Sequence, residues 1–243
     1  MIVADSIGFA ATHTICGILS ELPGFEVSHG SQNFETKAPI GPGSQSPAAF
    51  ARSMAEAARA GRHPVAVHTN FPPQAMQAAC LAEGITYRLL VRAPQAQIES
   101  CYAWIAKKAL DGDAAGFLGA LKVGLAPLQG AQIAASLPNV LYAFALQHVC
   151  GFNLMGLQTG AEVLRMEDLL SEEAAFRAAF EVPADCAIPH FEGEEKRLAS
   201  HRSKSQLEAL GAPEREVILA RLKVTAGGIA LPVSDLAQRL GYS

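Results

Sequence analysis

Apolar residues follow two alternating patterns along the chain, short continuous runs and longer stretches with helical spacing. The short runs predict strands at residues 1–5, 64–68, 86–91 and 161–166. The helical spacing predicts helices at residues 15–22, 47–60, 73–83, 94–110, 113–127, 139–157, 172–180, 203–210, 213–225 and 233–240. Because parallel neighbours need helical crossovers, this alternation predicts an α/β fold with a mainly parallel sheet flanked by helices.

Residues typical of helix starts, helix ends and loops support the predicted boundaries of these elements. Ser46 and Pro47 are typical of a helix start, and Gly61 of the stop that follows. Residues 30–47 are rich in Gly, Pro, Ser and Gln and predict an exposed loop that could move over a ligand. No repeat interrupts the chain, so we expect a single domain over residues 1–243, with a boundary near residue 112 as the alternative.

Composition narrows the class of protein. Half of the residues are hydrophobic and 17% are charged, which is typical of a globular core, and the net charge of −4 argues against broad binding to nucleic acid or acidic membrane. Each long apolar stretch is broken by polar residues, Gly or Pro, so we expect no membrane span, and a start without a basic region favours the cytoplasm. The cysteines are odd in number, lack metal-type spacing and are expected to be reduced, buried thiols: Cys16, Cys80, Cys101, Cys150 and Cys186.

The first predicted strand leads through a loop into a helix. In such a segment the loop N–H groups and the helix N-terminus point at an anion. Residues 8–14 read Gly-Phe-Ala-Ala-Thr-His-Thr, without the Gly-Lys-Ser/Thr of a Walker loop. Taken alone, the segment fits either a phosphate-binding loop or an ordinary strand-turn-helix connection.

A second candidate anion site follows the strand at residues 86–91. Arg92 stands at the carboxyl end of that strand, and Ser100 lies two turns into the next helix. Ligands of open α/β sheets bind beyond the carboxyl ends of strands, and an Arg with a hydroxyl can clamp a phosphate. The alternative is a surface Arg and a helix-interior Ser.

This stretch resembles the 3′-phosphate-binding segment of the P-loop sulfotransferases, in which an Arg closes a strand and a Ser follows eight residues later. Arg92, Pro94, Ser100 and Tyr102 match that pattern. Three further segments resemble elements of the family in the same order, so the resemblance covers nearly the whole chain: His-Thr-Asn-Phe-Pro at residues 68–72, the strand and Glu-Asp-Leu-Leu at residues 163–170, and Leu-Gly-Tyr at residues 240–242.

The resemblance implies a donor, a reaction and site residues. The donor would be 3′-phosphoadenosine 5′-phosphosulfate (PAPS), whose sulfuryl group passes without a metal to a hydroxyl or amine of a small-molecule or glycan acceptor. Arg92 and Ser100 would bind the 3′-phosphate. The residues around the 5′-phosphate would be Ala10, Ala11, Thr12, His13 and Thr14. Arg197 and Arg202 belong to a basic cluster in a segment that the family often brings over the 3′-phosphate, although a solvated surface run is the alternative.

Three positions depart from the family pattern. Phe9 stands where the family has a loop cation, Ala11 replaces a Gly, and Asn70 takes the place of the histidine base. An amide cannot accept a proton at neutral pH. On an extended strand His68 would share a face with Asn70, so we expect His68 to act as the base and Asn70 as a polar positioning group.

His13 is the other candidate base, near the predicted helix start, where the dipole favours its neutral form. A hydrogen-bonded, partly buried side chain is the structural alternative for His13 and His68. The sequence therefore predicts a sulfotransferase-like enzyme with a degenerate phosphate loop and leaves the oligomeric state open. A catalytically inactive nucleotide- or partner-binding protein is the alternative. A P-loop kinase is the third, against which the absent Walker lysine argues.

Overall fold

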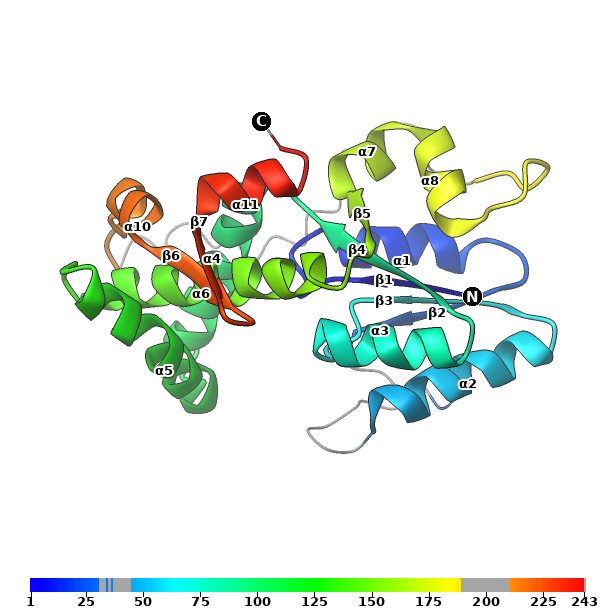
Figure 1. The fold of residues 1–243 in the computed structure, drawn as a ribbon, viewed down its shortest axis with the longest axis horizontal. Helices are drawn as coiled ribbons and strands as arrows, with labels where there is room; N and C mark the ends of the chain where they lie inside the picture. Colours follow the sequence, from blue (N-terminus) through cyan, green and yellow to red (C-terminus); the bar gives the residue numbers. More distant parts are fainter. Residues whose placement is uncertain (31–33, 35, 37–44, 189–209, 243) are drawn as a thin grey trace. The chain divides into compact units, whose positions relative to one another are not determined.

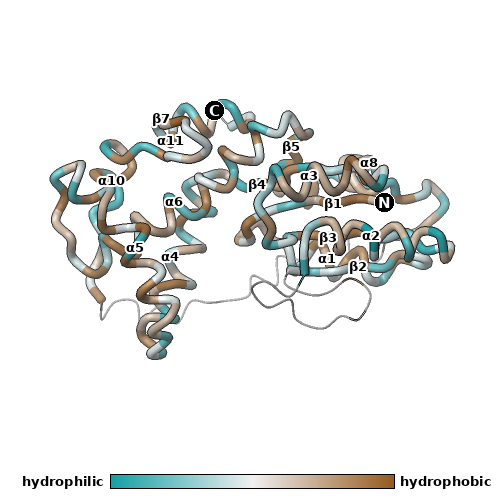
Figure 2. The backbone as a smooth tube through the Cα atoms, turned by 60° about the horizontal axis from the view of Figure 1, so that its bottom comes forward, coloured by the Kyte–Doolittle hydropathy of each residue, from teal (hydrophilic) through white to brown (hydrophobic). Residues whose placement is uncertain are grey.

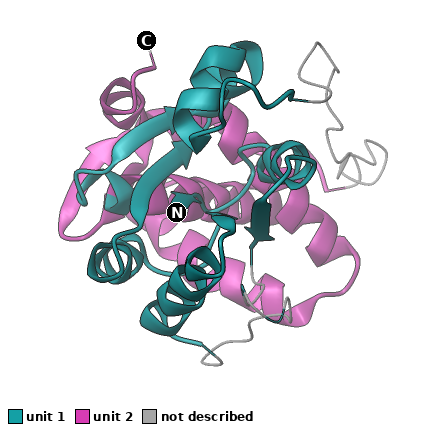
Figure 3. Cartoon of the chain, turned by 90° about the vertical axis from the view of Figure 1, so that its right-hand side faces the viewer, with its two compact units in different colours: residues 1–92, 155–198 teal, residues 93–154, 199–243 magenta. Residues whose placement is uncertain are grey.

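The computed structural model describes residues 1–30, 34, 36, 45–188 and 210–242 (Figure 1). The chain divides into two compact units, each described by itself (Figure 3). Unit 1 comprises Met1–Arg92 and Met155–Leu198, and unit 2 comprises Ala93–Leu154 and Ala199–Ser243. The single domain expected from the sequence stays a prediction.

A parallel sheet forms the centre of unit 1. Within the described residues it has five strands, which are, in spatial order, β2 (Phe25–His29), β3 (His63–Val67), β1 (Ile2–Asp5), β4 (Thr86–Val91) and β5 (Glu162–Arg165). Every neighbouring pair is parallel. The predicted α/β class with a mainly parallel sheet flanked by helices is therefore confirmed.

Helices cover both faces of this sheet. On one face lie α1 (Thr12–Ser20), α7 (Met166–Ser171) and α8 (Glu173–Phe180), and on the other lie α2 (Pro47–Arg59) and α3 (Pro73–Ala82) (Figure 1). Because successive strand side chains point to opposite faces, Ile2 and Ala4 of β1 join the core under α1, whereas Val3 joins the core under α2 and α3. Both faces of β1 are thus buried, and its trace is hydrophobic in Figure 2.

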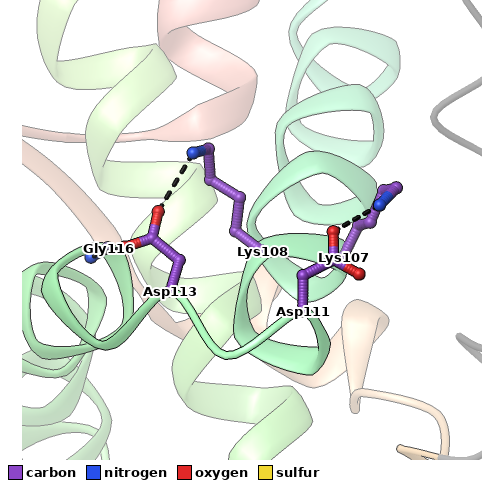
Figure 4. A network of polar contacts seen from close by, with 5 residues as sticks. All are labelled: Lys107, Lys108, Asp111, Asp113 and Gly116. Carbon is purple, nitrogen blue, oxygen red and sulfur yellow. Dashed lines mark hydrogen bonds and ion pairs between the residues drawn. The ribbon is translucent and has the colours of Figure 1, made fainter.

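Unit 2 is mainly helical. Its described elements are α4 (Pro94–Leu110), α5 (Ala114–Gly130), most of α6 (Leu137–Leu157), α10 (Arg215–Arg221), the antiparallel strands β6 (Lys223–Ala226) and β7 (Ile229–Pro232), and α11 (Val233–Arg239). In the turn between α4 and α5 the Asp113 carboxylate accepts hydrogen bonds from Gly116 N at 2.9 Å and Lys108 Nζ at 3.0 Å, and Lys107 pairs with Asp111 (Figure 4). The capped turn ends α4 and starts α5.

Helix α10 is attached to α4 and α6 by polar contacts. The Glu99 carboxylate accepts hydrogen bonds from Tyr142 Oη and from Arg215 Nε, each at 2.9 Å. The buried Asn139 side chain donates to Glu214 Oε1 at 2.7 Å and accepts from Glu214 N at 2.8 Å. These contacts attach α10, which comes late in the sequence, to the middle of the chain.

Helix α6 is long and apolar enough to cross a membrane, a helix that the sequence analysis did not single out in this way. Of its most apolar 18-residue window, 78% is buried inside the structure. A core helix passes the same test of length and composition, so this feature is weak evidence for a membrane span.

Most predicted elements are present, with several corrections. Helix α7 was not predicted, because the strand before it was expected to continue to Met166. The strand β2 was missed, because it lies at the sheet edge with one buried residue, Ser28, and lacks an apolar run. The predicted strand at residues 64–68 ends at Val67. The predicted helix at residues 213–225 is wrong beyond Arg221, because the chain enters a hairpin whose turn is made by Gly227 and Gly228, both with positive φ. The helix predicted at residues 203–210 falls almost wholly outside the described residues.

All five cysteines lie in the described part of the chain and are free thiols. Four of them are buried, as predicted, whereas Cys186 is half-buried.

Candidate functional site

The carboxyl end of β1 lies at the point in the sheet where the strand order reverses. From β1 the chain passes through α1 to β2 and β3 on one side, and later returns to β4 and β5 on the other. Neighbouring connections therefore leave β1 in opposite directions. Ligands of open α/β sheets bind at such a switch point, so the loop from Ser6 to Ala11 is the first place to look for a site.

This loop has a left-handed backbone at three positions. Gly8, Phe9 and Ala11 have φ values of 95°, 63° and 52°. Left-handed conformations cost non-glycine residues about 1–2 kcal/mol each, so the two side-chain-bearing positions store strain. Ala11 is the N-cap of α1 and has no side-chain acceptor, and the first N–H groups of a helix have no partner within the helix. Binding of an anion by this segment stays a prediction.

The five predicted 5′-phosphate residues do not share one environment. Ala10 is fully buried in the core under α1, so only its backbone can serve a ligand. Thr12 is 4% exposed, Thr14 is half-buried, and His13 is exposed. Among the side chains, therefore, His13 and Thr14 are the accessible ones.

His68 is oriented by the same loop. Its Nδ1 lies 2.6 Å from the Ser6 carbonyl oxygen, which can only accept, so Nδ1 carries the proton and Nε2 of the neutral ring has the lone pair. Burial and the nearby His13 lower the pKa of His68, while the bond to Ser6 works in the opposite direction. A Cβ added at Gly8 or Gly30 would lie within 4 Å of Nε2, so both glycines border this nitrogen. A neutral, oriented imidazole is suited to act as a base.

The geometric reason given for pairing His68 with Asn70 is wrong. Both residues have left-handed backbones, with φ values of 63° and 64°, so the chain is no longer extended after Val67. Between them Thr69 is buried, whereas Asn70 is exposed. The catalytic role of His68 stays a prediction that now rests on its contact with Ser6.

A third histidine joins the site. The ring of His29, the last residue of β2, stacks on the ring of His13 with centroids 3.9 Å apart, and lies 5.6 Å from the ring of His68. Its Nε2 is 2.9 Å from Thr12 Oγ1. We call His13, His29 and His68 the histidine cluster. The sequence did not indicate His29, because β2 has no apolar run that would predict a strand there. A histidine at the carboxyl end of a strand would have been the signal.

The buried carboxyl of Asp5 holds the segments on either side of the site by hydrogen bonds. Its Oδ1 accepts hydrogen bonds from Thr69 N, Thr69 Oγ1 and Ser6 N at 2.8, 3.0 and 3.1 Å, and its Oδ2 accepts from Tyr87 Oη at 3.1 Å. Burial raises the pKa of Asp5 to about 6, although all four hydrogen bonds lower it. Asp5 therefore fixes the two segments that carry His68 and its partner Ser6. The sequence does not indicate a role for Asp5, because a single Asp at the end of a strand matches no motif.

Stability should depend on pH through Asp5. The pKa of about 6 in the folded chain is above the ordinary value of about 3.9, so the protonated acid is favoured by the fold. This contribution is fully present below pH 4 and is lost as the pH rises through 6, which amounts to about 3 kcal/mol. Asp5→Asn, which imitates the protonated acid, should flatten the pH dependence of the unfolding free energy between pH 4 and 7.

Denaturant titrations across this pH range would measure the effect. Asp185→Asn, a change at an exposed carboxyl, is the matched control and should keep the wild-type profile. An Asp5→Asn protein whose stability falls with pH as steeply as the wild type would contradict the assignment.

The predicted 3′-phosphate residues lie in different units. Arg92 follows β4 as the last residue of the first segment of unit 1, and Ser100 lies in α4 of unit 2, and both are half-buried. Their convergence on one anion stays a prediction. Arg197 and Arg202 fall outside the described residues. Among the residues that the structure describes, no group of three or more His, Cys, Asp and Glu is placed to hold a metal ion.

Comparisons with known proteins add one finding. No protein-family model and no curated protein matches the chain. Among solved structures, the chain is similar to a sulfotransferase from Alicyclobacillus acidocaldarius at 14% identity and a TM-score of 0.44, over 86% of this chain and 94% of that one. A similarity of this size does not establish a function, so the functional assignment depends on the geometry at the carboxyl end of β1.

Proposed function

We propose that the chain is a sulfotransferase-like enzyme of the cytoplasm that transfers the sulfuryl group of PAPS to a hydroxyl or amine of a small-molecule or glycan acceptor. The observation that carries the proposal is the imidazole of His68, held by the Ser6 carbonyl at the switch point of the sheet, next to a left-handed loop that leads into α1. A base beside a cradle of amide donors is what an in-line group transfer requires.

The proposed reaction uses these two features in turn. Nε2 of His68 takes the proton of the acceptor hydroxyl as its oxygen forms a bond to sulfur. The bond from sulfur to the 5′-phosphate oxygen breaks, and adenosine 3′,5′-bisphosphate leaves with the added negative charge. Backbone N–H groups of residues 10–14 are proposed to stabilise that charge, because N–H groups at the start of a helix are held in place before the reaction begins.

Nucleotide binding is assigned to Arg92 and Ser100, which are proposed to bind the 3′-phosphate. Arg92→Ala should weaken binding of adenosine 3′,5′-bisphosphate by about 2 kcal/mol, or about thirtyfold, because a charge-assisted pair of hydrogen bonds is lost. Calorimetric titration measures this change. Arg52→Ala, at an exposed position of α2, is the control and should bind like the wild type.

The control also separates a local effect from a general loss of positive charge. Equal affinity of Arg92→Ala and wild type, with the fold intact by circular dichroism, would remove Arg92 from the site. Binding of ATP that requires Mg²⁺, in place of the bisphosphate, would favour the kinase alternative.

A second candidate function is nucleotide binding without turnover. It is favoured by Phe9 at the position of the family's loop cation and by an exposed amide, Asn70, at the position of its base. Losing a charge that acts on the transition state costs about a hundredfold in rate. A chain that binds adenosine 3′,5′-bisphosphate but never hydrolyses PAPS would establish this alternative.

A further inference from the structure

We propose that the histidine cluster, His13, His29 and His68, binds a tetrahedral oxyanion and takes up a proton as it does so, supplying the positive charge that the loop sequence lacks. The inference rests on the proposed function for the identity of the anion, which would be the 5′-phosphate group of the nucleotide. A free sulfate or phosphate ion has the same chemistry and is the other source. His29 thereby gains a binding role that no sequence motif indicates.

The fold brings the three rings together from separate elements. His13 is the second residue of α1, His29 ends β2, and His68 follows β3 directly. In the sheet His29 is paired with Val67, the residue before His68, so the register of two parallel neighbours sets the separation of these two histidines. All three therefore lie at the carboxyl edge of the sheet, where α1 begins.

The loop itself contains no permanent cation. Residues 8–14 include neither Lys nor Arg, and Phe9 stands where a cation would serve. The histidine cluster supplies side chains next to this segment that can become positively charged. His13 is exposed and the other two rings are half-buried, so an anion can reach the cluster from solvent while still meeting partly desolvated rings.

Without an anion His29 and His68 resist protonation. Burial, together with repulsion by His13 and His68, lowers the pKa of His29 to about 4. Burial and His13 also lower the pKa of His68. A dianion beside the rings reverses the repulsion, because it attracts the charged form of each imidazole. Binding near neutral pH should therefore be accompanied by proton uptake.

The surrounding groups determine where the proton can go. The Ser6 carbonyl holds the proton on Nδ1 of His68, and its Nε2 is the proposed base, so the proton taken up with the anion is assigned to His29 or His13. Nε2 of His29 contacts the Thr12 hydroxyl, which can rotate from donor to acceptor when His29 becomes charged. The buried carboxyl at the end of β1, Asp5, is bonded to Ser6, Thr69 and Tyr87 and stabilises the frame around the cluster.

Calorimetric titration of the whole chain with inorganic sulfate tests the proposal, since sulfate does not itself titrate between pH 6 and 8. Affinity should fall by up to tenfold per pH unit over this range, and the heat should differ between two buffers with unequal ionisation enthalpies. In His29→Gln the buffer dependence should shrink and the pH profile should flatten. His13→Gln should also reduce the buffer dependence and flatten the pH profile. Because His13 is exposed, this variant serves as the test if His29→Gln does not fold. His148→Gln, in α6 of unit 2, is the control and should behave as the wild type.

A second titration with adenosine 3′,5′-bisphosphate separates this inference from the proposed function. Nucleotide binding that competes with sulfate and takes up protons through His29 supports both. Sulfate binding with proton uptake, but no nucleotide binding, supports the cluster as a site for a free oxyanion and rejects the nucleotide. Nucleotide binding without proton uptake, or with uptake unchanged in His29→Gln and His13→Gln, overturns the histidine proposal and leaves the proposed function in place. No sulfate binding at any pH overturns the oxyanion site.

Discussion

Replacing His68 with alanine is expected to reduce sulfuryl transfer from PAPS by about 10²- to 10⁴-fold, the usual contribution of a positioned general base. His68 has the required geometry, because Ser6 holds its Nδ1 proton and leaves Nε2 to accept the proton of the acceptor. Its pKa is lowered by burial, so the base form is present at neutral pH. Hydrolysis of PAPS to adenosine 3′,5′-bisphosphate is a suitable assay, since it needs no knowledge of the acceptor.

Two other variants make the test specific. Asn70→Ala should change turnover by no more than a few-fold, because an exposed amide cannot take a proton. Phe9→Lys should raise turnover by about tenfold or more, since a cation in the loop stabilises the charge of the leaving phosphate. Phe9 already has a left-handed backbone, so the new side chain adds no further backbone strain.

Some outcomes would reject the role of His68. Equal losses in His68→Ala and Asn70→Ala would show that the loop after β3 matters only as a whole. If the wild type and Phe9→Lys bind the nucleotide and neither turns over PAPS, the binding-protein alternative replaces the enzyme.

Gly124→Ala is expected to destabilise the protein by about 3 kcal/mol, within the range of overpacked cores. Gly124 lies in α5 where that helix contacts α6, and an added Cβ would be 2.2 Å from the Val140 carbonyl oxygen and 3.0 Å from Phe144 N. Both are backbone atoms of a helix, so a rotamer change cannot relieve the contact. The two helices would have to separate.

A matched control lies in the same helix. Gly119 has no atom within 4 Å of the position of an added Cβ, so Gly119→Ala should stabilise α5 by about 0.5–1 kcal/mol through its higher helix propensity. Denaturant titrations of both variants give the comparison directly. Gly124→Ala unfolding at the wild-type denaturant concentration would show that α5 and α6 do not pack closely in solution.

The sequence was sufficient where one local pattern determined the structure. The alternation of apolar runs and helical stretches predicted β1, β3, β4, β5 and the helices between them, and Ser46 with Pro47 predicted the start of α2, where Ser46 Oγ accepts from Ala49 N at 3.2 Å. Strands buried on both faces must be apolar throughout, which makes them visible in a sequence. The loop before α1 was predicted for the same reason, since it joins two such elements.

The edge strand β2 and the hairpin of β6 and β7 could not be predicted from local apolar patterns. β2 is paired on one side only and contains Glu26 and His29, so its formation depends on β3, which comes more than thirty residues later in the sequence. The hairpin of β6 and β7 follows a helix whose pattern seemed to continue, and two glycines with positive φ end it. In both places the partner, rather than the local sequence, selects the strand.

For the candidate site, too, some features could be predicted from the sequence and others could not. By itself the sequence determined the parallel α/β fold, the loop ahead of α1 and the choice of His68 as a candidate base. These follow from local patterns of burial and from side-chain chemistry. Only the tertiary structure decided that His68 leaves the strand, that Ser6 orients its ring, that His29 stacks on His13, and that Asp5 lies buried beneath them. The physical reason is that these contacts join residues from different strands, and a side chain acquires its pKa and its partners from neighbours that lie far away in the sequence.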